Sequence, residues 1–102
     1  MRKAKLTVRI RGSEDRPDEF EAWMTKDHFP KMLAYPGVED AALLRKFLGD
    51  DPFRYTALYT FRDVETLRGF MASDVLAALA AEFDETWGDA SVRQRFAYEE
   101  LP

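Results

Sequence analysis

A single histidine is the side chain best suited to move a proton in this chain of 102 residues. His28 stands within the run WMTKDHFP at residues 23–30, and an imidazole with its ordinary pKa of about 6.5 gains and loses a proton near neutral pH. The chain has no cysteine, no glycine-rich phosphate loop and no clustered metal ligands, so we expect neither a metal nor a cofactor. His28 is therefore a candidate general acid or base. The alternative is a structural histidine that stabilises the end of its own helix.

Several aromatic residues could form a pocket beside this histidine. Tyr55 and Tyr59 fall on the same side of one expected strand, and a buried phenol needs a hydrogen-bond partner that a ligand can supply. We therefore expect one of these tyrosines to orient the histidine or a substrate. Further candidates to line a pocket for a flat, hydrophobic ligand are Trp23, Phe29 and Tyr35. The alternative for each aromatic residue is ordinary packing in the core.

Three arginines are candidates to bind an anion. Arg93 and Arg95 share one face of the last expected strand, while Arg9 belongs to the first. A guanidinium group binds a carboxylate through two parallel hydrogen bonds, so pairing of the first and last strands would create an oxyanion or carboxylate site. The alternative is that these arginines form surface salt bridges with the 19 acidic residues of the chain.

The pattern of apolar residues predicts four strands that would position these side chains. Residues 4–11 alternate between apolar and polar types, which is typical of a strand with two distinct faces. Residues 54–61 are rich in aromatic and β-branched types and are apolar on both sides. The other expected strands are residues 38–48, also apolar on both sides, and residues 91–101.

The same pattern predicts two helical regions. The first helix is expected over residues 17–29, because Pro17 suits the first turn and apolar residues follow at helical spacing. Pro30 disfavours a helical Phe29, so we expect a break or kink there and a short extra turn over residues 31–34. The later helices are expected at residues 64–72 and 74–87, with Asp63 and then Ser73 or Asp74 as N-caps and Gly88 at the C-terminal end.

This order of elements, β-α-β-β-α-β, predicts a single ferredoxin-like α+β domain over residues 1–102. Such a domain has a four-stranded antiparallel sheet with two helices on one face. Because the second and third strands are apolar on both sides, the face left open by the helices would also be apolar. We therefore expect a homodimer in which two sheets meet face to face, a dimeric α+β barrel.

Composition excludes several classes of protein. A content of 46% hydrophobic and 14% aromatic residues is sufficient for a packed core. The net charge of -4 argues against nucleic-acid binding, which needs a basic face. No apolar run approaches the roughly 18 residues of a membrane span, and no signal peptide is visible. We expect a cytoplasmic protein that binds neither nucleic acid nor membranes.

Several of these motifs resemble those of a known superfamily. They are the run Trp23-x4-His28-Phe29-Pro30, the turn at Gly37, the strand YTALYTF at residues 55–61, and an ending that contains Phe83, Gly88, Arg93 and Arg95. With them, nearly the whole chain resembles the dimeric α+β barrel superfamily, whose members include EthD-like proteins, small polyketide cyclases, muconolactone isomerases and cofactor-independent antibiotic-biosynthesis monooxygenases. It resembles most closely a branch known only as a domain of unknown function. The resemblance implies a pocket between sheet and helices, or inside the barrel, and an acid–base role that only His28 can take.

These features predict a small cofactor-independent enzyme that acts on a hydrophobic or aromatic metabolite. The expected reaction is a proton transfer of the isomerase, cyclase or lyase type, with His28 as general acid or base. The alternative is a non-catalytic homodimer that binds a small molecule or serves as an accessory protein. A cavity at His28 would favour the enzyme, whereas a hydrogen bond from its ring to a backbone carbonyl would favour the structural role.

Overall fold

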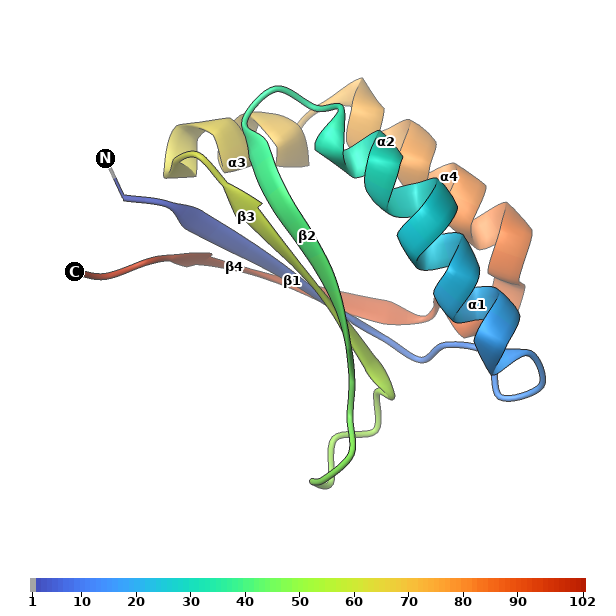
Figure 1. Ribbon diagram of the computed structural model, residues 1–102. Helices are drawn as coiled ribbons and strands as arrows, with labels where there is room; N and C mark the ends of the chain where they lie inside the picture. Colours follow the sequence, from blue (N-terminus) through green and yellow to red (C-terminus); the bar gives the residue numbers. More distant parts are fainter. Residues whose placement is uncertain (1) are drawn as a thin grey trace.

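Four antiparallel strands form one sheet in the computed structural model, which describes residues 2–102 (Figure 1). The order across the sheet is β2-β3-β1-β4, and all helices cover the same face. This arrangement confirms the expected ferredoxin-like α+β fold. The strands are β1 (Ala4–Ile10), β2 (Val38–Arg45), β3 (Tyr55–Phe61) and β4 (Arg93–Glu99).

The first helical region is continuous through Pro30, contrary to the expected break. It consists of α1 (Pro17–Trp23), a π-helical segment η1 (Met24–His28) and α2 (Phe29–Leu33). The N–H of Phe29 donates to the carbonyl of Met24, five residues earlier, so the turn before the proline is wider than an α-turn. Pro30 then occupies the first turn of α2, where its missing N–H and fixed φ are tolerated.

The later helices begin at the expected caps. Asp63 accepts a hydrogen bond of 2.8 Å from the N–H of Thr66 and starts α3 (Val64–Met71). Ser73, rather than Asp74, caps α4 (Asp74–Trp87) by accepting from the N–H of Leu76. Gly88 follows α4 with a φ of 54°, which a residue with a side chain rarely adopts, and opens a short 3-10 segment η2 (Gly88–Ser91).

Two strands are shorter than their sequence patterns predict. β2 ends at Arg45, three residues before the expected end at Leu48, and its hairpin to β3 projects from the sheet (Figure 1). The side chains of Phe47 and Leu48 are 96% and 83% exposed, because neither packs on the sheet of its own chain. β4 begins at Arg93 because the residues before it form η2.

The core lies between the sheet and the helices. The inward face of the sheet is fully apolar on β1 and β3, where Leu6, Ile10, Tyr55 and Tyr59 are at most 2% exposed. The face opposite the helices, here called the open face, mixes apolar and polar types. By strand register it comprises Asp40, Ala42, Leu44, Thr56, Leu58, Thr60, Lys5, Thr7, Arg9, Gln94, Phe96 and Tyr98.

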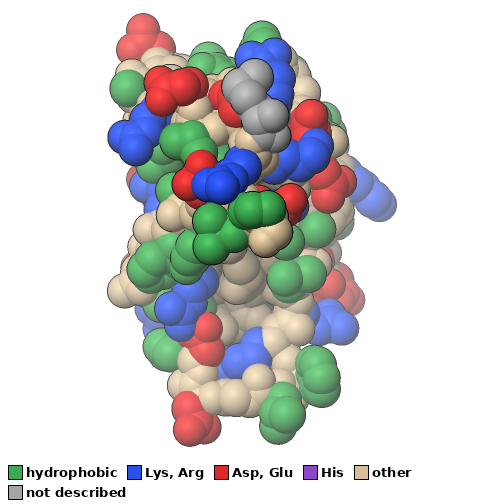
Figure 2. Space-filling view, turned by 90° about the vertical axis from the view of Figure 1, so that its left-hand side faces the viewer, with side chains coloured by type: hydrophobic (Ala, Val, Ile, Leu, Met, Phe, Trp, Pro, Cys, Tyr) green, Lys and Arg blue, Asp and Glu red, His purple; other side chains and the backbone are tan. Residues whose placement is uncertain are grey.

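The surface carries charge of both signs. The side of the molecule where both chain ends lie shows apolar, basic and acidic side chains interspersed, with no histidine visible (Figure 2). Within residues 2–102, no helix combines the length and the apolar character needed to cross a membrane.

Candidate functional site

His28 lies at the end of the π-helical segment, with its ring buried among aromatic side chains. The residue is 6% exposed. Its ring stacks on Trp23, with centroids 5.3 Å apart and planes 16° apart, and meets the ring of Phe83 at 5.7 Å in an edge contact. Nδ1 is fully enclosed and has no hydrogen-bond partner among the described residues. A structural role at the end of the helix would need a hydrogen bond from the ring to a backbone carbonyl, and Nδ1 makes no such bond in residues 2–102.

This environment keeps the imidazole neutral. Burial lowers the pKa of His28 to about 4, because the charged form loses its hydration. The surrounding charges are mixed: Glu82 and Asp27 raise the pKa, while Lys31 and Arg93 lower it, and burial outweighs them all. At neutral pH the ring therefore presents one N–H donor and one nitrogen acceptor.

A small cavity lies beside this ring, between the sheet and helices α2 and α4. The volume open to the centres of water-sized molecules is about 30 Å³, which is room for roughly two waters. Four polar or charged residues from three elements line it, namely His28, Tyr59, Arg93 and Arg95. The rest of the lining is apolar and consists of Leu6, Val8, Ile10, Met32, Phe70, Leu76, Leu79, Ala80 and Phe83.

Tyr59 brings a protonated phenol to this cavity. It is 2% exposed on β3, and the ring of Phe29 meets its ring edge-on at 5.5 Å. Burial raises the pKa of Tyr59 far above its ordinary value, so the hydroxyl stays protonated and can donate a hydrogen bond. The positive charge of Arg95 acts in the opposite direction and lowers the pKa of Tyr59. The guanidinium of Arg95 is therefore close enough to the phenol to interact with it electrostatically.

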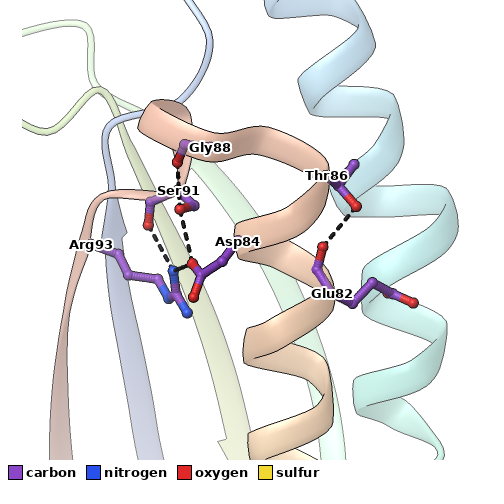
Figure 3. Close-up of polar contacts among 6 residues, drawn as sticks. All are labelled: Glu82, Asp84, Thr86, Gly88, Ser91 and Arg93. Carbon is purple, nitrogen blue, oxygen red and sulfur yellow. Dashed lines mark hydrogen bonds and ion pairs between the residues drawn. The ribbon is translucent and has the colours of Figure 1, made fainter.

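The three candidate arginines have separate environments. Arg93 Nη1 donates to Asp84 Oδ1 at 2.7 Å and to the Ser91 carbonyl at 2.8 Å (Figure 3). Arg95 also lines the cavity, but it makes no hydrogen bond or ion pair with any residue in 2–102. Arg9 lies on the open face, paired with Asp51, and so does not join the other two.

Two candidate tyrosines lie away from the cavity. Tyr55 donates a hydrogen bond of 2.7 Å to Glu21 Oε2, which also accepts from Arg45 at 3.0 Å. Burial and this carboxylate raise the pKa of Tyr55 to about 12, so the pair links α1 to the sheet rather than acting on His28. Tyr35 packs edge-on against Phe70 at 4.9 Å and does not line the cavity.

Phe83 and Asp84 are site residues that the sequence patterns did not single out for function. The ring of Phe83 contacts the His28 ring and lies 4.9 Å from the guanidinium carbon of Arg93. Asp84 binds Arg93 and also accepts from the Ser91 hydroxyl at 2.9 Å (Figure 3). The one sequence feature that could have indicated them is Gly88. A glycine there ends the helix and lets the chain reverse, so that the last strand runs back beside the end of the helix that carries Phe83 and Asp84.

A salt bridge links helices α2 and α4 near His28. Lys31 on α2 pairs with Glu82 on α4, with Nζ and Oε2 2.8 Å apart. Both charges influence the pKa of His28, so the bridge lies near the buried ring.

The fold defines a class of protein, the ferredoxin-like α+β domains, and here the sheet and helices enclose a small, mostly apolar cavity. Solved structures of this class resemble the chain over nearly its full length. An ethyl tert-butyl ether degradation (EthD) family protein from Bacillus halodurans is 20% identical, with a TM-score of 0.71 over 99% of this chain and 100% of that one. A DABB family protein with a ferredoxin-like fold from Mesorhizobium loti is 13% identical, with a TM-score of 0.74 over 100% of both chains.

SnoaB, a cofactor-independent oxygenase from Streptomyces nogalater, is 18% identical, with a TM-score of 0.71 over 98% of this chain and 94% of that one. Identities this low establish the shared fold alone. No curated protein matches the sequence. The model of the domain of unknown function DUF4286 matches residues 5–101, and the chain belongs to that family.

Proposed function

We propose that this protein is a small cofactor-independent enzyme that moves a proton on a hydrophobic or aromatic molecule, with His28 as the general base. One observation carries the proposal: a buried neutral imidazole, a protonated phenol and two guanidinium groups share one cavity whose other lining residues are apolar, and one of the guanidinium groups has no ion-pair partner in residues 2–102. Converging polar groups in an apolar pocket are the usual form of a small-molecule site.

The chemistry follows from the protonation states. A neutral nitrogen of His28 takes a proton from an acidic C–H or O–H of the substrate, and the substrate becomes an anion. The Tyr59 hydroxyl donates a hydrogen bond to the oxygen on which that charge develops. Because burial lowers the pKa of His28 to about 4, its imidazolium is a stronger acid than a free imidazolium and returns the proton readily, to the same atom or to another. Return to another atom completes an isomerisation or a cyclisation.

Substrate entry requires the helices to separate, because a cavity of about 30 Å³ is smaller than a metabolite. The bridge between Lys31 and Glu82 joins the two helices that would part. A π-helical segment ends at His28, and such segments are frequent at functional sites. SnoaB supports the proposal at the level of the fold alone, since it is described as a cofactor-independent oxygenase and this fold therefore hosts catalysis without a cofactor.

The base role is testable with 5-nitrobenzisoxazole, an aromatic probe whose ring opens when a base removes one C–H proton. The ring N–O bond breaks in the same step, and the product is the coloured 2-cyano-4-nitrophenolate. We expect His28→Gln to lower the rate at least tenfold, because acid–base groups contribute about 10²–10⁴-fold to rates. Lys26→Gln, an exposed change on the same helical segment, should leave the rate unchanged.

Equal rates for the wild type and His28→Gln would contradict the base role. Saturable binding of the probe without ring opening would favour the alternative, a small-molecule-binding protein with a structural histidine. Circular dichroism spectra and thermal midpoints of both variants serve to separate loss of function from loss of fold.

We also propose that two copies pair through their open faces. On this face Leu44, Phe96 and Tyr98 are 49%, 38% and 53% exposed, and the adjacent hairpin exposes Phe47 and Leu48 almost completely. Leu44 lies on one edge strand of this face, and Phe96 and Tyr98 lie on the other. Leu58 lies between the two edges, in the row that joins Phe96 to Ala42. Exposed apolar groups spread over one sheet face favour a protein partner.

Sedimentation equilibrium at micromolar concentration should therefore give the mass of a dimer. Leu44→Asp should give a monomer with unchanged helix content, because the new charge would be buried without a partner in the interface. Val75→Asp, on the exposed side of α4, is the matched control and should remain a dimer. A wild-type protein of monomer mass would contradict the pairing.

A further inference from the structure

We infer that Arg95 is the anion-binding residue of the cavity, and that the molecule bound there joins a carboxylate or similar oxyanion to an apolar ring. This inference rests on the proposed function for the location of the site. It adds the class of ligand and assigns one arginine among three candidates.

The position of Arg95 suits the mouth of the cavity. It lies on β4 opposite Val8 of β1, on the face that the helices cover. Its side chain lines the cavity, yet the residue as a whole remains exposed. Part of this side chain is therefore open to solvent, and another part borders the cavity that His28 also lines.

Arg95 also differs from its neighbour in what it binds. Arg93 donates from Nη1 to Asp84 and to the Ser91 carbonyl, so its charge is already paired with a carboxylate (Figure 3). Its guanidinium also lies over the ring of Phe83. Arg95 has no ion-pair partner in residues 2–102. Its planar guanidinium therefore retains the two parallel donors that fit a carboxylate.

The charge balance of the cavity favours an anion. Its lining contains two guanidinium groups, a neutral imidazole and a neutral phenol, but no carboxylate. Burial and the charge of Arg93 lower the pKa of Arg95, and together they outweigh Asp84 and Tyr59, which raise it. The protein as a whole has a net charge of -4, so this positive site is a local feature rather than a general one.

The apolar lining indicates the rest of the ligand. Leu79, Ala80 and Phe83 form the wall that α4 contributes, and Met32 adds a flexible side chain from α2. A ring packed on this wall would place its anionic group at Arg95 and its acidic proton toward His28. The fit is to an aromatic or alicyclic carboxylate.

The test uses benzoate as the probe and benzamide as its neutral counterpart of nearly equal shape. Isothermal titration gives the affinities, and the NMR signals of the single imidazole report whether the probe reaches His28. We expect benzoate to bind at least tenfold more tightly than benzamide and to shift the His28 signals. Arg95→Gln should weaken benzoate binding at least tenfold, and Arg95→Lys should recover part of it, because a lysine keeps the charge but not the paired donors.

Arg68→Gln is the matched control, since it removes one exposed positive charge from α3, outside the cavity, and should leave benzoate affinity unchanged. Arg95→Gln should keep the wild-type thermal midpoint without ligand, because the part of the chain that the structure describes contains no ion-pair partner of Arg95. Equal affinity for the two probes, unchanged benzoate affinity in Arg95→Gln, or absence of benzoate binding would each overturn the inference.

Failure of this inference is distinguishable from failure of the proposed function. If His28→Gln loses probe turnover but Arg95→Gln binds benzoate as tightly as the wild type, the anion-site inference fails and the base role of His28 stands. If benzoate binding depends on Arg95 but probe turnover does not depend on His28, the anion-site inference stands and the proposed catalytic role of His28 fails.

Discussion

Replacing Phe83 by alanine is expected to lower the free energy of unfolding by about 3–5 kcal/mol, the usual cost of deleting a buried phenyl ring. Phe83 is 3% exposed and joins the helices to the sheet and the site. Its ring centroid lies 5.4 Å from that of Trp23, 5.7 Å from that of His28 and 6.2 Å from that of Phe20. The substitution would therefore remove packing from several partners and enlarge the cavity that Phe83 lines.

Urea denaturation of the purified protein measures this loss. Val75→Ala is the control on the same helix, and because Val75 is 42% exposed its cost should stay within about 0.5 kcal/mol. Benzene should raise the thermal midpoint of Phe83→Ala more than that of the wild type, since the substitution enlarges an apolar cavity that can bind an apolar ligand. A loss below about 1 kcal/mol would show that Phe83 is not a central part of the core.

The free energy of unfolding is expected to fall by about 3 kcal/mol as the pH drops through the range set by His28, because one pKa unit corresponds to about 1.4 kcal/mol. The pKa of His28 is about 4 in the folded protein, against an ordinary value of 6.5. Above the ordinary value both states hold a neutral ring, and this part of the stability is fully present. Below it the unfolded chain binds a proton that the folded protein refuses, so stability is lost until the pH reaches about 4.

His28→Gln should remove this dependence. Carboxylates such as Asp63 and Asp84 have lowered pKa values and lose their own contributions only in more acidic solution. The comparison is therefore best made from about pH 7 to about pH 5, where we expect His28 to account for about 2 kcal/mol. Parallel stability curves for the wild type and His28→Gln would contradict burial of a neutral ring, as would a titration of the His28 NMR signals with a midpoint near its ordinary pKa.

Most elements of the fold could be predicted from local patterns. The alternation in β1 and β3 and the caps at Asp63 and Ser73 are properties of short segments, and the structure places strands and helices there. The break expected at Pro30 was wrong. The helix instead widens by one residue before the proline and stays continuous, and the residues at the two ends of the wide turn, Met24 and Phe29, are both buried. The end of β2 was misplaced because Phe47 and Leu48 have strand-like side chains, but pairing decides where a strand stops.

The candidate site could be predicted only in part. His28 and Tyr59 meet at one cavity with two of the three arginines. Tyr55 shares its strand face with Tyr59, but four residues of strand separate them by roughly 13 Å, beyond reach of the same site. The sequence could not place Arg9 because the face of a strand residue depends on the strand register. Arg9 pairs with Gln94 and lies on the open face, whereas Arg95 pairs with Val8 and lies on the face that the helices cover.

The sequence by itself determined the order of the elements, the class of fold and the fact that only one imidazole is available for proton transfer. It also predicted that Arg9, Arg93 and Arg95 were candidates for an anion site. Only the tertiary structure decided that this imidazole is neutral, that Tyr59 lines the same cavity, and that Arg95, among the three candidate arginines, has no ion-pair partner in residues 2–102. The physical reason is that protonation and pairing depend on burial and on neighbouring charges, and around His28 these come from α2, α4 and β4, which are far apart along the chain.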